Sequence, residues 1–195
     1  MEIIDYNSDY VICVKPIGLD SETGMVLVLK ECLTGEFYPV HRLDQNVGGV
    51  MVYARNKKAA ALLSQVIQEG KMVKEYVACV HGCVEPYGDW EDLLYKDMRK
   101  NKVFVVKKMR KGVKKARLEY RLIHSSDTSL VRITLHTGRS HQIRVQFASR
   151  GFPLVGDHKY GARDKETAPM LYSCAITFPF YGKEQHYESL PKWAL

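Results

Sequence analysis

The segment HRLDQNVGGVMVYA, residues 41–54, predicts a polar loop that runs directly into a buried β-strand. Asp44 follows the basic pair His41–Arg42, and we predict the strand over residues 49–54. A carboxylate that reacts, rather than being only solvated, needs a cation held close to keep it ionised. Asp44 is therefore a candidate nucleophile or base at a sheet edge, and a turn-capping aspartate is the plainer alternative.

A second cluster of donors, GRSHQIR, occupies residues 138–144. Ser140 is the predicted cap of a helix that carries Ile143, Phe147 and Ala148 on its apolar side, with Gly151 after its end. Arg144 lies one helical turn after His141, so a rigid support would carry its guanidinium. Arg144 is therefore interpreted either as a charge partner for Asp44 or as an ordinary surface arginine.

The other hydrophobic patterns predict more strands than helices. We expect a helix that begins after Asn56 and stops at Gly70, while residues 25–29 fit either a strand or a short buried helix. Further strands are predicted at residues 10–14, 73–84, 116–124, 130–136 and 171–178. Neighbouring strands are joined mostly as hairpins, which predicts an α/β fold of the α+β type with a largely antiparallel sheet.

Length and composition are those of an ordinary globular chain. The 195 residues are 46% hydrophobic and 26% charged, without repeats or a low-complexity linker, so we expect one domain over residues 1–195. The N-terminus lacks the basic region of a signal peptide, and no apolar run is long enough for a membrane helix, which favours a cytoplasmic protein. Five cysteines in mostly apolar runs predict buried, reduced thiols; zinc at Cys79, His81 and Cys83 is the weaker interpretation.

The positive charge is concentrated in one segment, which we call the basic arm. Residues 96–117 contain eleven Lys or Arg side chains and a single acid, Asp97, within a chain whose net charge is +7. Such a concentration favours contact with a phosphate backbone, and a solvated loop that only aids solubility is the alternative. The run 103–106 and a turn near Gly112 suggest a hairpin. The candidate RNA-binding cations are Lys107, Lys108, Arg110, Lys111, Lys114 and Lys115.

Motifs of several other enzyme classes are missing from the sequence. The chain has no Gly-x-Ser-x-Gly elbow, phosphate-binding glycine loop, His-Glu-x-x-His segment or paired-aspartate metal motif. The function class that remains is a reaction carried out by a single acid on an RNA-like polyanion. Tyr76, in the run KEYVA, fits either the core or an aromatic floor on which a base stacks.

Taken together, these pieces resemble the RluA-type family of RNA pseudouridine synthases. They occur in the family's order at similar separations and span most of the chain. The matching segments are Val11–Gly18, His41–Asp44 with Gly49, Lys74–Tyr76, Gly138–Val145 and Gly151–Gly161.

The resemblance implies the pseudouridine synthase fold, a mixed and mostly antiparallel bent sheet around a central cleft. Asp44 would be the catalytic aspartate, Tyr76 would stack on the uracil and take part in proton transfer, and Arg144 would pair with Asp44. Arg42 would fill the space left by a flipped-out uridine. His41, Arg139 and His141 would contact RNA. The substrate would be a stem-loop of rRNA or tRNA, acted on by a monomer, and no metal or other cofactor is implied.

Two departures from the family keep alternatives open. Val47 and Gly48 occupy positions where relatives usually carry Thr-Ser, so two hydroxyls near the catalytic turn are missing. The chain also begins almost at the first catalytic motif, so we expect no separate N-terminal RNA-binding domain. A catalytically weak RNA-binding protein of the same fold, or an assembly factor that uses the basic arm, therefore remain as alternatives.

Overall fold

The computed structural model describes all residues, 1–195, and its contacts divide the chain into two compact units. Unit 1 comprises Met1–Lys74 and Tyr172–Leu195, so both ends of the chain belong to it. Unit 2 comprises Glu75–Leu171. Each unit is described by itself below. A single catalytic domain over residues 1–195 stays a prediction.

Unit 1 is built on a sheet whose central strand carries the Asp44 loop. This strand is β4 (Gly48–Ala54), and all of its residues are buried. It pairs antiparallel with β2 (Tyr10–Lys15), which pairs with β1 (Glu2–Tyr6). On its other side it pairs antiparallel with the short β3 (Tyr38–Pro39) and parallel with β10 (Leu171–Phe180), which pairs antiparallel with β11 (Lys183–Glu188). The predicted strands at 10–14, 49–54 and 171–178 are confirmed.

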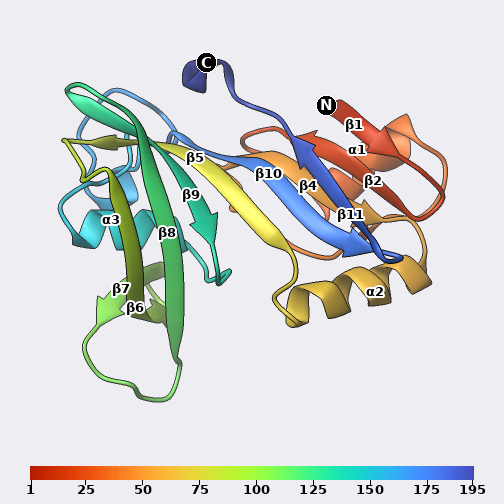
Figure 1. The fold of residues 1–195 in the computed structure, drawn as a ribbon, viewed down its shortest axis with the longest axis horizontal. Coiled ribbons are helices and arrows are strands. Elements are labelled where there is room, and N and C mark those ends of the chain that lie inside the picture. The colour runs from red at the N-terminus through yellow and green to blue at the C-terminus, as the bar shows by residue number, and fades with distance from the viewer. The chain divides into compact units, whose positions relative to one another are not determined.

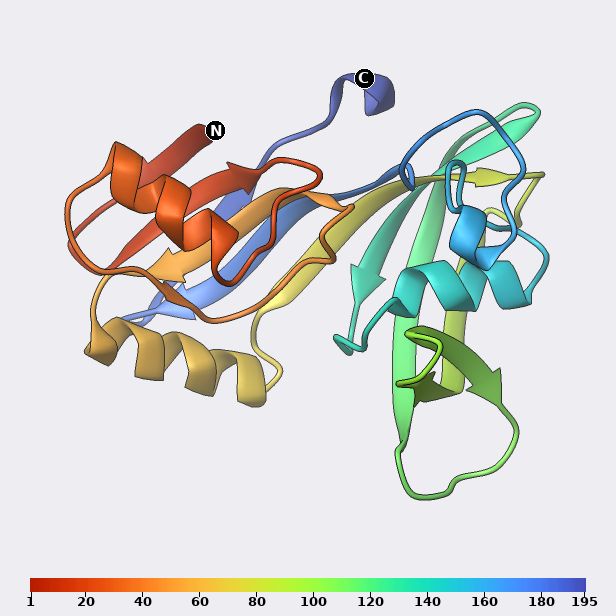
Figure 2. The same ribbon diagram turned by 180° about the vertical axis from the view of Figure 1, so that it is seen from behind.

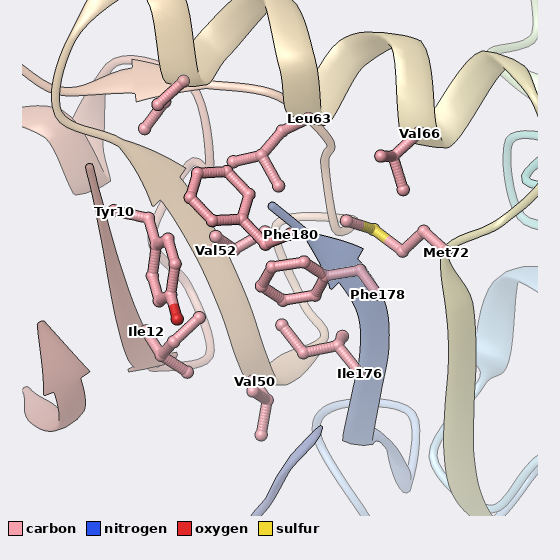
Figure 3. Close-up of a cluster of buried hydrophobic side chains, with 12 residues drawn as sticks. Tyr10, Ile12, Val50, Val52, Leu63, Val66, Met72, Ile176, Phe178 and Phe180 are labelled. Atoms are coloured by element: carbon pink, nitrogen blue, oxygen red, sulfur yellow. The ribbon is translucent and has the colours of Figure 1, made fainter. Parts of the chain in front are cut away.

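Helix α2 (Lys57–Gln68) covers one face of this sheet. Asn56 is its N-cap, as predicted, because its side-chain oxygen accepts the Ala59 N–H at 2.8 Å. Leu63 and Val66 point from the helix toward Val52 and Phe178, which Figure 3 shows within the same hydrophobic cluster. Burial of these apolar faces holds the helix on the sheet.

Residues 25–29, which fitted a strand or a helix, lie in helix α1 (Gly24–Cys32). Met25 and Leu29 are fully buried one turn apart, while Leu27 between them is 65% exposed. Only a helical period places 25 and 29 on one side and 27 on the other. Helix α1 lies behind β1 and β2 in Figure 1 and in front of them in Figure 2, which shows the reverse side.

Unit 2 contains a second, antiparallel set of strands. They lie in the order β5 (Val73–His81), β9 (Thr128–Leu135), β8 (Val113–Ser125), β6 (Tyr87–Asp97) and β7 (Lys102–Val106). The predicted pairing of residues 116–124 with 130–136 is confirmed, with Leu118 opposite Leu135. The mixed α/β fold with a mostly antiparallel sheet is therefore as expected.

The basic arm does form a hairpin, but its partner and turn differ from the prediction. Strand β7 pairs with β6, with Asp97 opposite Lys102, so the hairpin turn lies at residues 98–101. Strand β6 also pairs with β8 and so separates β7 from it. The residues around Gly112 form a longer connection from β7 to β8, at the lower end of Figure 1. One physical reason is that Val103, Leu94 and Ala116 pack together on one face when β6 is the middle strand.

Helix α3 (Gln142–Ser149) packs against this face, but its predicted cap was wrong. His141, not Ser140, is the N-cap residue, and it adopts a left-handed conformation with φ 51°. The Gln142 side chain accepts hydrogen bonds from the Thr137 hydroxyl at 2.8 Å and the Arg139 N–H at 3.1 Å. These bonds join the first helical residue to the loop before the helix, and no side chain caps the helix start. Short 3₁₀ turns lie at His158–Tyr160 and Lys192–Ala194.

All five cysteines are free thiols, and the prediction that they are buried holds only in part. Cys13 and Cys174 are buried, and burial raises the pKa of the Cys13 thiol to about 12. Cys32 and Cys83 are exposed, because Cys32 ends helix α1 and Cys83 follows strand β5.

No helix of the structure combines the length and the apolar character needed to cross a membrane.

Candidate active site

Beneath the Asp44 loop lies the buried ammonium group of Lys15, at the end of β2. The residue has no exposed surface, and its Nζ donates to the carbonyls of Pro16 at 2.9 Å, Leu19 at 2.8 Å and Gln45 at 3.1 Å. Burial lowers the pKa of Lys15 to about 8, while the nearby carboxylates of Asp20 and Asp44 act to raise it. Lys15 thus supplies a cation near Asp44 that the sequence patterns did not reveal.

The residue after Asp44 ties the loop to the segment that follows β2. The Gln45 side-chain amide donates to the Gly18 carbonyl at 2.9 Å, and the Gly18 N–H donates to the Gln45 carbonyl at 2.9 Å. The Asp44 carbonyl accepts the Val47 N–H at 3.0 Å, which closes a turn over residues 44–47. These bonds and those of Lys15 hold the backbone on both sides of Asp44. Asp44 itself is partly exposed and lies on a rigid turn.

The two glycines after this turn allow the backbone to approach its neighbours closely. Gly49 has φ 128°, and a Cβ there would overlap the Ser173 backbone on β10. At Gly48 a Cβ would lie 3.1 Å from the Lys15 carbonyl oxygen. A serine at position 48 would therefore need a small shift of β2 in this chain.

His41 has an internal role, although the sequence led us to expect contact with RNA. Its Nε2 accepts the Val52 N–H of β4 at 3.1 Å, and its Nδ1 is buried with no hydrogen-bond partner. Burial, assisted by the charge of Lys74, lowers the pKa of His41 to about 3. The ring is therefore neutral at physiological pH and supports the strand that follows Asp44. Contact of His41 with RNA stays a prediction.

This environment predicts that His41 makes stability depend on pH. Its pKa is about 3 in the folded protein against an ordinary 6.5, so its contribution to stability is complete above about 6.5 and is lost as the pH falls toward 3. Within that window the slope from His41 approaches about 1.4 kcal/mol per pH unit.

The measurement is urea unfolding at several pH values for the wild type and for His41→Gln, which keeps an acceptor but does not titrate. The difference between the two proteins in unfolding free energy should widen toward neutral pH. A constant difference from pH 4 to 7 would contradict the assignment.

Arg42 lies on the surface, in keeping with its expected role. Its guanidinium is 3.4 Å from the Glu22 carboxylate, and the two side chains are 70% and 52% exposed. An ion pair exposed to this extent contributes little to stability. Arg42 can therefore leave Glu22 at small cost to contact another anion.

Arg144 belongs to unit 2 and is a buried arginine rather than a surface one. Its Nε and Nη2 donate to the two carboxylate oxygens of Asp157 at 2.7 and 2.8 Å, and the residue is only 7% exposed. This bidentate pair fixes the plane of the guanidinium. Asp157 was missed, although it directly follows a glycine in a turn-rich segment, GDHKYG.

Tyr76 lies on β5 and is 6% exposed, which fits both the core and the floor of a binding pocket. The neighbouring Glu75 accepts two hydrogen bonds from the Arg132 guanidinium at 3.1 and 3.0 Å. Because Arg132 stands on β9, this pair ties the first residues of β5 to the adjacent strand.

The basic arm presents its predicted cations to solvent. All six are exposed, and none forms an ion pair with an acid: Lys107, Lys108, Arg110, Lys111, Lys114 and Lys115. Arg110 stacks over the Tyr95 ring at 4.9 Å. Arg117 differs, because it binds Asp89 and Glu119 at 2.9 Å each and so its charge is neutralised within unit 2.

The other predicted RNA contacts, Arg139 and His141, lie just before helix α3. Arg139 is exposed and its Nε donates to the Lys115 carbonyl at 2.9 Å, which places its side chain beside the arm. The His141 Nδ1 lies 2.9 Å from the Tyr160 hydroxyl. Their contact with RNA stays a prediction.

In the segment suggested for zinc, His81 contacts an acid instead. Its Nε2 lies 2.6 Å from an oxygen of the Asp164 carboxylate, which also accepts the Gly156 N–H. No group of three His, Cys, Asp or Glu side chains in the chain is arranged to hold a metal ion.

Comparisons with known proteins agree with this geometry. Residues 9–149 match the RNA pseudouridylate synthase family. A protein named dual-specificity RNA pseudouridine synthase RluA, from Escherichia coli K12, is 32% identical over 96% of this chain and 92% of its own length. An RNA pseudouridine synthase of Aquifex aeolicus is 36% identical over 150 residues, and ribosomal large subunit pseudouridine synthase D of Borreliella burgdorferi is 37% identical over 139 residues. The chain covers only 46% and 42% of these two longer relatives.

Solved structures show the same fold. Human RNA pseudouridylate synthase domain containing 1 superposes with a TM-score of 0.86 at 21% identity, covering 97% of this chain and 83% of that one. Human RNA pseudouridylate synthase domain containing 4 gives a TM-score of 0.83 at 23% identity, covering 99% and 90%. With the family match over residues 9–149, these results place the chain: it belongs to the RNA pseudouridylate synthase family.

Proposed function

We propose that this protein isomerises uridine to pseudouridine in structured RNA. The observation that carries the proposal is the Asp44 turn, which Lys15 and Gln45 hold from both sides in a chain of this family. A reactive carboxylate needs a rigid support and a nearby cation, and the turn provides both.

The proposed reaction is an isomerisation that balances within the nucleotide. The bond between the sugar C1′ and uracil N1 breaks, the base rotates, and a bond forms between C1′ and C5. The proton leaves C5 and N1 gains one from solvent, so no electron acceptor or donor is consumed. Because the reacting bond is inaccessible in a stacked strand, the uridine must first flip out of the stack.

Four residues carry the proposed chemistry. Asp44 acts on the nucleotide during cleavage of the glycosidic bond, as nucleophile or base. Tyr76 stacks on the uracil and assists proton transfer, and Arg144, whose guanidinium plane Asp157 fixes, pairs with Asp44. Arg42 fills the space that the flipped uridine leaves, which its exposed position and weak pairing with Glu22 support.

We further propose rRNA or tRNA as the substrate and a cytoplasmic monomer as the working form. The names of the relatives support the substrate class, since one is a ribosomal large subunit enzyme and another a dual-specificity enzyme. The free thiols of the chain are those expected in a reducing compartment.

The direct test is the release of tritium from RNA labelled at uracil C5. Purified wild-type protein should release tritium from total RNA of a strain that lacks the gene. Binding of that RNA without any release would overturn the proposal and favour an RNA-binding protein that has lost catalysis. Val47 and Gly48 carry no hydroxyl groups beside the Asp44 turn, and this is the observation that favours an RNA-binding protein without catalysis as the second candidate function.

The basic arm yields a separate prediction about salt. Replacing Lys107, Lys108 and Lys111 with Ala should flatten the dependence of RNA affinity on salt, by about 0.7 in the log–log slope for each single-strand phosphate that the arm no longer neutralises. The reason is that fewer condensed counterions are released. The measurement is a filter-binding titration across salt concentrations.

A matched control replaces Lys57, Lys58 and Lys183, three exposed lysines of unit 1 outside the arm, with Ala. This variant has the same reduction in net charge but should keep a slope close to the wild type. Equal changes in both variants would show that only total charge matters and that the arm makes no phosphate contact.

A further inference from the structure

A single turn of unit 2 holds Arg144 on two sides. The Asp157 carbonyl accepts the N–H groups of Tyr160 at 2.9 Å and Ala162 at 3.2 Å, which fixes Asp157 and Tyr160 in one turn. From this turn the Asp157 carboxylate binds Nε and Nη2 of Arg144, and the Tyr160 ring centroid lies 5.2 Å from its Cζ. The carboxylate fixes one edge of the guanidinium, and the aromatic ring supports it by a cation–π contact.

The hydroxyl of Tyr160 reaches two further elements. It accepts the Val103 N–H of strand β7 at 2.9 Å and lies 2.9 Å from Nδ1 of His141. Tyr160 is 9% exposed, so these bonds are largely shielded from water. Lys102, beside Val103, places its Nζ 5.2 Å from the centroid of the Tyr160 ring. One side chain thus joins the basic arm, the start of α3 and Arg144.

His141 is the most strained of these neighbours. Its φ of 51° lies in the left-handed region that L side chains rarely adopt, and no side-chain cap bond supports it. Its ring meets the Tyr160 ring edge to face, with centroids 5.7 Å apart and planes at 87°. The Tyr160 hydroxyl accepts the Val103 N–H, so its own O–H can donate a hydrogen bond to the His141 Nδ1. If Nδ1 accepts this bond, the neutral His141 ring carries its proton on Nε2.

We propose that Tyr160 is a positioning residue with two separable actions: its ring orients Arg144 for the chemical step, and its hydroxyl orients His141 and β7 for RNA binding. This inference rests on the proposed RNA isomerase activity. It adds a residue that touches neither the nucleotide nor its reacting atoms and works only through its neighbours.

The two actions predict different kinetic defects. Tyr160→Phe removes the hydroxyl and keeps the ring, so KM for RNA should rise about five- to tenfold while the single-turnover rate at saturating RNA stays within about twofold of the wild type. Tyr160→Leu also removes the ring, so the single-turnover rate should fall on the order of a hundredfold through the misplaced guanidinium. Tyr181→Phe, at a 55% exposed tyrosine of unit 1, is the matched control and should change neither value.

An NMR measurement tests the geometry without RNA. In the wild type, ¹⁵N shifts of the His141 ring should report a proton on Nε2 and an acceptor at Nδ1. Tyr160→Phe should remove this preference and leave the Arg144 Nε–H resonance unchanged. Tyr160→Leu should shift or broaden that resonance. If the Leu variant does not fold, the Phe variant alone decides the hydroxyl's role.

The outcomes separate this inference from the proposed function. A wild-type protein that never releases tritium contradicts the isomerase proposal. The NMR measurement on His141 still tests the hydrogen bond from Tyr160 in that case, because it needs no RNA. A fall in RNA affinity and single-turnover rate together in Tyr160→Phe, with reduced stability, would show a merely structural tyrosine and overturn the inference. An unchanged His141 signal in Tyr160→Phe would also overturn it.

Discussion

Asp44→Asn is expected to lower tritium release from uracil-labelled RNA by on the order of a thousandfold or more, because it removes the reacting carboxylate. Asparagine keeps the size of the side chain and leaves untouched the backbone bonds that close the turn, from the Asp44 carbonyl to the Val47 N–H and from the Gln45 carbonyl to Gly18. The fold and the affinity for RNA should therefore remain, with Kd within about threefold of the wild type.

The matched control is Asp20→Asn, because both carboxylates interact with the buried Lys15. Asp20 accepts hydrogen bonds from the N–H groups of Thr23 and Gly24, which an asparagine oxygen can still accept. Its variant should keep most of the activity. If activity falls equally in the two variants, the effect belongs to the charge around Lys15 and not to catalysis by Asp44.

Gly49→Ala is expected to cost at least about 3 kcal/mol of unfolding free energy and to abolish activity. The residue has φ 128°, and the new Cβ would overlap the Ser173 backbone. Since Gly49 lies opposite Ser173 where β4 and β10 pair, the strands would have to separate beside the Asp44 turn. Urea unfolding measures the decrease.

Gly70→Ala provides the control for backbone strain alone. Gly70 follows α2 with φ 69°, and nothing lies within 4 Å of a Cβ built there. Its replacement should cost about 1 kcal/mol, the usual penalty for a left-handed alanine. Decreases of equal size at the two positions would contradict the close approach of β4 to β10.

Local patterns were sufficient for some elements and not for others. The cap at Asn56 and the apolar spacing of α2 lie within one segment, so the sequence predicts that helix correctly. The hairpin of β6 and β7 was misplaced because residues 98–101, Met-Arg-Lys-Asn, contain neither glycine nor proline, whereas Gly112 suggested a turn. The cap of α3 was misplaced by one residue: His141 takes the N-cap position, and its side chain contacts Tyr160, nineteen residues away in the chain, which no local pattern reveals.

The residues of the site likewise divide into those that a local pattern revealed and those that it did not. Asp44 was found because it stands in a recognisable segment with its flanking basic residues and glycines. Lys15 and Asp157 were missed, since Lys15 acts through three backbone carbonyls and Asp157 through an arginine thirteen residues earlier. A lysine at the end of the apolar strand YVICV is the signal that could have pointed to a buried ammonium.

The most direct test of the central claim is a map of pseudouridine at every position of cellular RNA. Three strains are compared: one with the wild-type gene, one without it, and one complemented with Asp44→Asn. Our account predicts at least one position in rRNA or tRNA that is modified only in the wild-type strain. Identical maps in all three strains would contradict it.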